Sequence, residues 1–287
     1  MRPLLALWLM RHGMSPWLAP NYFILAGFAA LVGCIVVMRL AREDGADLRA
    51  ESRTLLLAYL GALLGGYVLE ALRAIPQGLA TRSLAPILGA GRAAYGGLLA
   101  ATLCAAIYRF YHRHPIAPFF DRVSLVLGLV YLAVRSGCFL AGCDYGEPTA
   151  LPWGVRYPPG SLAALDHASR GWVPFGAPSL PTHPTQLYEG AWAMLGSLLA
   201  LTIYHRGRGR RGRRDGSAFA AWVAMYAVGR FLIEFLRGDD SRGLYLGLST
   251  AQYISLGLCV LVGISMLLHS RSERAVTARL EAGGASS

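Results

Sequence analysis

Long apolar runs, separated by short polar connections, follow one another along most of this chain. Each run is close to the roughly 20 residues that an α-helix needs to cross a lipid bilayer. Runs such as Phe23–Met38 and Leu248–Leu268 are apolar on all sides, whereas helices of soluble proteins alternate apolar and polar positions with a period of about 3.6 residues. We therefore predict an all-α fold, a polytopic membrane helical bundle of about seven transmembrane helices. The expected segments are Asn21–Leu40, Arg53–Ile75, Tyr95–Tyr111, Phe119–Ala141, Pro184–His205, Ser217–Leu236 and Leu248–His269.

The connections predict how the bundle is oriented. Cytoplasmic loops carry an excess of basic residues, and a dense run of arginines, Arg206–Arg214, follows the fifth segment. If that run is cytoplasmic, the N-terminus lies outside and the C-terminus inside. The connection Gly142–His183, between the fourth and fifth helices, is then a periplasmic cap, and its aromatic residues favour an ordered cap over a flexible loop. Ser83–Ala94 is weakly apolar and contains glycine, so a re-entrant segment is an alternative interpretation of this stretch. Six or eight crossings are then alternatives to seven.

Composition agrees with a membrane protein and excludes a nucleic-acid-binding one. Hydrophobic residues make up 55% of the chain, charged residues 15%, and the mean hydropathy is +0.43, whereas soluble domains carry about 25% charged residues. The net charge of +11 would suit nucleic acid, but the arginines lie mostly in short loops between apolar runs. We expect one transmembrane domain over residues 1–270, with the cap at 142–183, and a disordered cytoplasmic tail over 271–287.

Two arginines lie within apolar segments rather than in the connections. Arg135 is near the outer end of the fourth segment, and Arg230 lies deep in the sixth. An unpaired guanidinium in hydrocarbon costs at least ~3 kcal/mol, so such residues usually face a polar interior. Arg230 could form a structural pair with Glu234, but Tyr226 and Arg237 share the same stripe. This stripe favours a polar site, and two guanidinium groups predict binding of an anionic lipid phosphate.

Other polar groups could complete that site. His183, Gln186 and Glu189 stand at the start of the fifth segment, although an interfacial histidine is common in membrane proteins. Gly96 and Gly97 open the third segment, where paired glycines permit either close approach of a lipid or helix packing.

The cysteines divide into two groups. Cys34, Cys104 and Cys259 lie in apolar segments and are expected to be packing residues. Cys138 and Cys143 flank the cap, and we favour a disulfide between them, with free thiols or metal ligands as the alternatives. One pair of cysteines is weak evidence for zinc. We expect neither a metal nor a cofactor.

Three motifs resemble those of the bacterial prolipoprotein diacylglyceryl transferases, in that family's order and approximate spacing. They are RSGCFLAGCDYG from Arg135, HPTQLYE from His183 and YAVGRFLIEFLRGD from Tyr226. The resemblance covers residues from about Tyr22 to Leu268, and seven crossings with the N-terminus outside is also the family's topology.

The resemblance implies transfer of a diacylglyceryl group from phosphatidylglycerol to the lipobox cysteine of a prolipoprotein signal peptide, in the bacterial cytoplasmic (inner) membrane. Arg135 and Arg230 match arginines thought to hold the lipid phosphate, and Glu234 and Tyr226 match polar partners on the same helix. Gly146 matches the glycine that closes the signature. By the same resemblance, Tyr22 is a candidate substrate-binding residue.

The chain also departs from the family's pattern. Cys138 and Ala141 replace two asparagines of the signature, Cys143 replaces a glutamate, and Tyr95 stands where the family has a histidine proposed as the base. The acceptor thiol must become a thiolate to react, and Tyr95, His183 or a lipid-bound water are the candidate bases. The alternatives are a phospholipid-binding paralogue without thioether chemistry, and a lipid transferase with a different acceptor.

Overall fold

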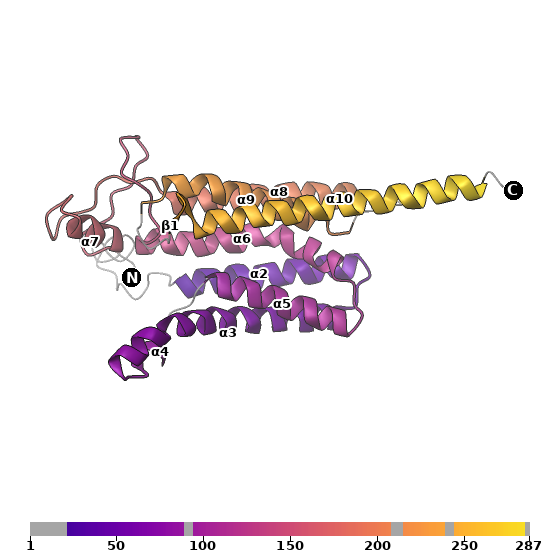
Figure 1. Cartoon of the computed structure of the whole chain (residues 1–287), viewed down its shortest axis with the longest axis horizontal. Coiled ribbons are helices and arrows are strands. Elements are labelled where there is room, and N and C mark those ends of the chain that lie inside the picture. The colour runs from indigo at the N-terminus through magenta and orange to yellow at the C-terminus, as the bar shows by residue number, and fades with distance from the viewer. Residues whose placement is uncertain (1–21, 89–93, 208–214, 239–243, 285–287) are drawn as a thin grey trace. The chain divides into compact units, whose positions relative to one another are not determined.

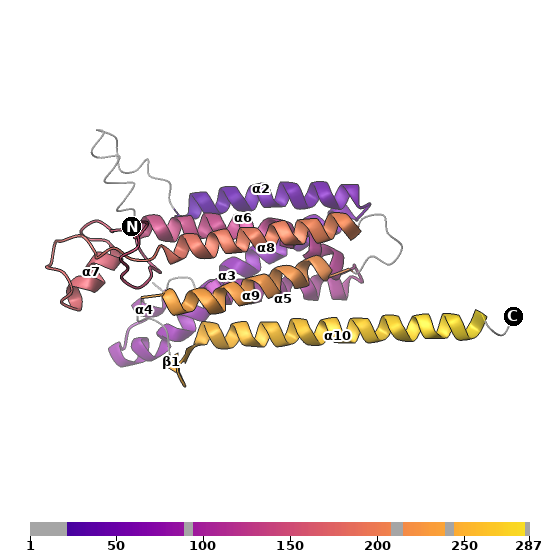
Figure 2. The same cartoon turned by 90° about the horizontal axis from the view of Figure 1, so that it is seen from above.

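The computed structural model describes residues 22–88, 94–207, 215–238 and 244–284, with side chains left out at 22, 23, 86, 88, 94, 95, 244 and 268–284. The chain divides into two compact units, residues 1–33 with 124–287, and residues 34–123. Helices α2 (Tyr22–Glu43) and α6 (Ala117–Ala141) each contribute residues to both units. Figures 1 and 2 show the helices from two directions.

Helices α3 (Leu48–Thr81), α4 (Ala85–Leu88) and α5 (Ala94–Tyr111) belong to the unit of residues 34–123. Asp47 caps α3 by accepting hydrogen bonds from the backbone N–H groups of Arg49 and Ala50, at 2.9 and 3.3 Å. Helices α3 and α5 lie side by side (Figures 1 and 2). Small residues permit this, because a Cβ added to Gly96 would lie 2.4 Å from the backbone oxygen of Gly65 on α3.

A buried ion-pair cluster ties the ends of these helices together. Glu51 lies 3.0 Å from Arg109 and 2.7 Å from Arg122, and Arg122 also pairs with Asp44 at 3.2 Å. All but Asp44 are fully buried. Two arginines, one near the end of α5 and one near the start of α6, are therefore held inside the protein, where a lost partner would leave an uncompensated buried charge.

The other unit is built on α6, α8 (Thr185–Gly207), α9 (Ser217–Ile233) and α10 (Thr250–Gly284), with a 3₁₀ turn η2 (Glu234–Leu236) after α9. A two-stranded antiparallel hairpin, β1 (Leu244–Tyr245) and β2 (Leu248–Ser249), leads into α10. Helix α9 packs between α8 and α10. Gly128 lets α6 approach α8, since its N–H donates to Ser197 Oγ at 2.9 Å, and Gly229 of α9 faces the ring of Trp192.

The connection between α6 and α8 is folded, as the compact-cap alternative predicted. It contains the short helix α7 (Leu162–Ser169), capped by Ser161, and a small core of Tyr145, Tyr157 and Ala163. The His167 ring is fully buried, with Nδ1 accepting a hydrogen bond from the Leu180 N–H at 3.1 Å.

Each of the seven apolar segments predicted from the sequence coincides with a helix: α2, α3, α5, α6, α8, α9 and α10. Within the described residues, five of these are long and apolar enough to cross a membrane, while Gly96–Tyr111 of α5 is apolar but shorter. The polar first turn of α8, with Thr185, Gln186 and Glu189, lowers its hydropathy. The chain is a multi-pass membrane protein with an all-α fold; seven crossings and the orientation stay predictions.

The domain boundaries stay a prediction as well. Helix α10 continues as helix through Gly284, where the sequence predicted a disordered tail from residue 271. Figure 1 shows α10 extending past the ends of α8 and α9.

Candidate functional site

Helices α6 and α8 bring a tyrosine, an arginine and a glutamate together. Tyr131 and Arg135 lie one turn apart on α6, so both side chains point to the same face. Arg135 Nη2 lies 2.6 Å from Glu189 Oε2 on α8 and donates to Tyr131 Oη at 2.8 Å. Tyr131 in turn donates to Glu189 Oε2 at 2.8 Å. The Glu189 side chain is only 3% exposed, so a single carboxylate is held by two donors from α6.

Helix α9 and its 3₁₀ extension bring two more arginines to the same carboxylate. Arg230 Nη1 is 3.4 Å and Arg237 Nη1 is 3.6 Å from Glu189 Oε1. Arg230 also pairs with Glu234, which begins η2 four residues later, as the sequence spacing predicted. All of these side chains are at least nine-tenths buried. Arg135 and Arg230 therefore converge on Glu189 from different helices.

The loop after α6 supplies the third carboxylate. Asp144 has a positive φ of 55°, which turns its side chain back towards the helices. Its Oδ2 lies 3.0 Å from Arg135 Nη1 and its Oδ1 lies 2.6 Å from Arg237 Nη2. Burial acts to raise the Asp144 pKa, but Arg237 and Arg135 together hold that pKa below its ordinary value.

Gly146 explains how this loop reaches the end of α9. It pairs with Arg237 in an isolated antiparallel bridge and donates its N–H to the His183 carbonyl at 2.9 Å. A Cβ at this position would lie 2.7 Å from the Leu236 backbone oxygen. Only glycine permits so close an approach of two backbones.

Among the described residues, the charges in this cluster balance. Three arginines, Arg135, Arg230 and Arg237, face three carboxylates, Asp144, Glu189 and Glu234. A buried set of this kind is costly to break, because removing one partner leaves a charge without compensation in a medium of low polarity. We call these six residues the ion-pair network.

A small hollow adjoins the network. Its polar lining comes from Glu189, Arg230 and the tyrosines 131 and 226, and its apolar lining includes Trp192. The Tyr226 ring meets the Tyr131 ring edge-on, with centroids 5.5 Å apart, and stacks on Trp222. The hollow thus has both charged and aromatic walls.

Two other predicted residues have structural partners. Gln186 Nε2 donates to the Cys143 carbonyl at 2.6 Å and to Tyr157 Oη at 3.1 Å. His183 Nδ1 lies 3.4 Å from Tyr188 Oη, and within the described part of the chain His183 forms no ion pair. Gln186 therefore fixes the loop that carries Asp144, while His183 lies beside the backbone of that loop.

The remaining predicted residues lie on α2 and α5. Gly96 and Gly97 are buried against α3, where a Cβ on Gly97 would lie 2.8 Å from the Ala62 backbone oxygen. This geometry gives the glycines the helix-packing role that the sequence left open, and their part in substrate binding stays a prediction. The side chains of Tyr22 and Tyr95 lie outside the described residues.

Sequence reasoning missed Tyr131 and Asp144 as members of the site. A tyrosine in an apolar helix four residues before Arg135 was the available signal for the first, because residues four apart share a helix face. Asp144 lies within the signature itself, but its role depends on a turn with positive φ that a sequence pattern does not specify.

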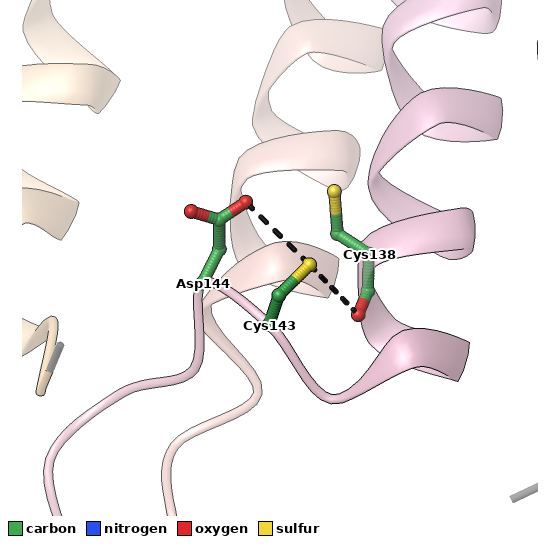
Figure 3. A group of neighbouring side chains, drawn as sticks. All are labelled: Cys138, Cys143 and Asp144. Atoms are coloured by element: carbon green, nitrogen blue, oxygen red, sulfur yellow. Dashed lines mark hydrogen bonds between the residues drawn. The ribbon is translucent and has the colours of Figure 1, made fainter. Parts of the chain in front are cut away.

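Cys138 and Cys143 come close together at the end of α6, beside Asp144 (Figure 3). Both are free thiols in the structure, as are Cys34, Cys104 and Cys259. A hydrogen bond from the Cys143 thiol reaches the Cys138 carbonyl at 3.6 Å.

Comparison with known proteins gives a consistent result. The model of the prolipoprotein diacylglyceryl transferase family matches residues 17–269. A phosphatidylglycerol–prolipoprotein diacylglyceryl transferase of Clostridium tetani is 28% identical over 85% of this chain and 90% of its own length. One from Cereibacter sphaeroides is 29% identical over 88% of this chain and 91% of its own length. One from Clostridium perfringens, numbered 2, is 26% identical over 84% and 87%.

The match spans nearly every helix described above, including the three elements that carry Arg135, Glu189 and Arg230. This chain belongs to the prolipoprotein diacylglyceryl transferase family.

Proposed function

We propose that this protein transfers a diacylglyceryl group from phosphatidylglycerol to the lipobox cysteine of prolipoprotein signal peptides, in the bacterial cytoplasmic membrane. Family membership and the names of the relatives support the reaction. Five helices that could cross a membrane support the location.

In this reaction the acceptor sulfur attacks the glyceryl carbon that bears the phosphate. A C–S bond forms and the C–O bond to the phosphate breaks, so the electron pair leaves on the oxygen of glycerol phosphate. The thiol proton leaves the sulfur before or during attack, because the thiolate is the nucleophile. The enzyme must therefore bind a phosphodiester and stabilise the negative charge that develops on it as it departs.

One observation carries the proposal: Arg135 and Arg230 both reach the same buried carboxylate, Glu189. Two guanidinium groups that share one carboxylate are close enough to share one phosphate, which presents a similar pair of oxygens. Arg135 also has a buried Nε without a hydrogen-bond partner among the described residues. That N–H group can donate a hydrogen bond to a phosphate oxygen.

The other members of the network have supporting roles in this proposal. Glu234 orients Arg230, and Asp144 orients both Arg135 and Arg237. Tyr226 lines the hollow beside Arg230, next to the proposed place of the glyceryl group. Gln186 and Gly146 hold the loop that carries Asp144 in place. Tyr22, Gly96 and Gly97 stay proposed substrate contacts, and Tyr95 and His183 stay candidate bases.

A lipobox-peptide assay with purified protein and phosphatidylglycerol tests the proposal. We expect the peptide to gain the mass of one diacylglyceryl group, with glycerol phosphate released in equal amount. Complementation of a strain depleted of its own transferase is the matching test in cells. Bound phosphatidylglycerol without any lipidated peptide would contradict the proposal and favour a lipid-binding paralogue.

A further inference from the structure

Two thiols and a carboxylate lie together where α6 ends. The sulfur atoms of Cys138 and Cys143 and a carboxylate oxygen of Asp144 all lie within 4.8 Å of one another, as Figure 3 shows. The Cys143 sulfur is 4.0 Å from Asp144 Oδ2. Cys143 and Asp144 are only partly buried, so the cluster is open to ligands from outside. We call these three residues the thiol triad.

Backbone geometry at the helix end fixes the triad. The Cys143 N–H donates to the Cys138 carbonyl and the Gly142 N–H to the Phe139 carbonyl, both at 3.2 Å, and Gly142 has a φ of +70°. This is the Schellman ending of a helix, in which the residues at the two ends of the longer bond usually make an apolar contact. Here both of those residues are cysteines. The sequence alone showed the two cysteines. The backbone turn at Asp144 brings a third potential ligand beside them.

Distances in the triad are close to those of a metal site. Zinc lies about 2.3 Å from a thiolate sulfur, which separates two sulfurs in a regular tetrahedral site by about 3.8 Å. The triad therefore needs side-chain movements of about 1 Å to close around an ion. The two soft thiolates favour zinc over magnesium or calcium, which prefer hard oxygen ligands, and a carboxylate also occurs as a zinc ligand.

We propose that Cys138, Cys143 and Asp144 bind a thiophilic divalent cation of the zinc class, with its fourth coordination position open to the acceptor thiol. The second half of this statement rests on the proposed function. Three protein ligands and one open position are the arrangement of catalytic rather than structural zinc sites.

The charges around the triad are compatible with a bound cation. Two thiolates and one carboxylate outweigh the two positive charges of the ion, so the occupied site is a net anion beside Arg135 and Arg237. A metal on Asp144 would also draw part of its negative charge away from these arginines.

The triad gives the acceptor thiol a route to its reactive form. A thiol that coordinates zinc loses its proton, and that proton passes to water at the exposed side of the site. The metal-bound thiolate then forms the C–S bond while the C–O bond to the phosphate breaks, as in the proposed reaction. No electrons are exchanged with any other reagent.

Metal content of the full-length protein tests the site directly. The protein is purified in detergent under reducing conditions without a metal-affinity step, given Zn²⁺, dialysed and analysed for bound metal. We expect about one zinc per chain in the wild type and in the control Cys259→Ser, whose cysteine lies in α10. Cys138→Ser and Cys143→Ser should lose the bound zinc, and Asp144→Asn should bind zinc at least about 10-fold more weakly.

A second measurement uses Co²⁺ in place of Zn²⁺. The wild type should then show a sulfur-to-metal charge-transfer band that both serine variants lack.

Several results would overturn the site: the wild type binds less than stoichiometric zinc, or the serine variants keep the zinc. Alternatively, protein alkylated directly in isolated membranes contains a Cys138–Cys143 disulfide. The lipobox-peptide assay separates the two proposals. If metal-free protein lipidates the peptide, the triad has no role in the reaction and the proposed function stands. A protein that holds zinc on the triad but makes no product keeps the site, and refutes both the function and the acceptor role.

Discussion

Arg135 on α6 and Glu189 on α8 form an ion pair of 2.6 Å, with the arginine side chain 13% and the glutamate 3% exposed. Because Arg230 and Arg237 also reach Glu189, this single carboxylate connects the arginines of the network. The predictions below follow from that relationship and from the packing that maintains it.

Replacing Glu189 with glutamine keeps the side-chain volume but removes the charge that the arginines share. Three buried guanidinium groups would then face two carboxylates, and loss of one partner of a buried ion pair costs about 3–5 kcal/mol. We expect a clear fall in the thermal unfolding temperature in detergent. Glu43→Gln is the control, because Glu43 pairs with Arg39 at the surface. Equal unfolding temperatures for the wild type and Glu189→Gln would show that the network does not stabilise the fold.

Replacing Arg230 with lysine keeps the charge and removes the planar fork of donors. A lysine cannot pair with Glu234 and with a phosphate in the same two-pronged way. Loss of a donor aimed at developing charge costs about 10²–10³ in turnover number, and we expect a loss of that order in the lipobox-peptide assay. Arg39→Lys, at an exposed position, should retain activity. Full activity in Arg230→Lys would mean that its charge alone suffices.

Gly229 sets the separation of α8 and α9. A Cβ at Gly229 would lie 2.0 Å from Trp192 Cδ1, so Gly229→Ala must displace the indole that lines the hollow. We expect a lower unfolding temperature and weaker lipid binding, since overpacking costs about 1–3 kcal/mol. Gly257→Ala is the matched control, because nothing lies within 4 Å of the added Cβ in α10. A variant at Gly229 as stable as that control would contradict the packing described above.

The buried ring of His167 leads us to predict that the stability of the cap, residues 142–183, depends on pH. Burial lowers the His167 pKa below its ordinary value of about 6.5, and Nδ1 accepts a hydrogen bond only when it is unprotonated. Arg170 adds to this lowering of the His167 pKa, and the opposing effect of Asp166 does not outweigh burial. The unfolded cap then binds a proton at a higher pH than the folded one, so cap stability is full above about pH 6.5 and falls as the pH drops towards the lowered pKa.

Limited proteolysis of the cap at a series of pH values measures this effect. Cleavage between residues 142 and 183 should increase as the medium becomes more acidic than about pH 6.5. His167→Gln should remove most of the change. A cap equally resistant at all these pH values, in a wild type that remains active, would contradict the role of His167.

The apolar runs were enough to predict every long helix in the described part of the chain, because length and hydropathy alone decide which segments can lie in a bilayer. The helical spacing of the sixth segment likewise predicted that Tyr226, Arg230, Glu234 and Arg237 share one face. In the structure α9 ends at Ile233, Glu234 lies in η2, and Arg237 follows with extended backbone. The pairing of Arg230 with Glu234 is confirmed. The proposed roles of these residues in substrate binding and catalysis stay predictions.

What the sequence did not predict depends on contacts between distant segments. Glu189 was expected near the site, but nothing in the pattern showed that it joins three arginines. Asp144 reaches the site through a backbone conformation with positive φ. Arg109 and Arg122 both form ion pairs with the buried Glu51. The sequence did not distinguish them from loop arginines, because each stands near one end of an apolar run.

The central claim is that Arg135 and Arg230 together hold the phosphate of phosphatidylglycerol. Native mass spectrometry of the detergent-released protein measures the bound lipid directly, without relying on turnover. The account predicts that the wild type and Arg39→Gln retain phosphatidylglycerol, whereas Arg135→Gln and Arg230→Gln each lose it. Retention of the lipid by both buried-arginine variants at the wild-type level would contradict the account.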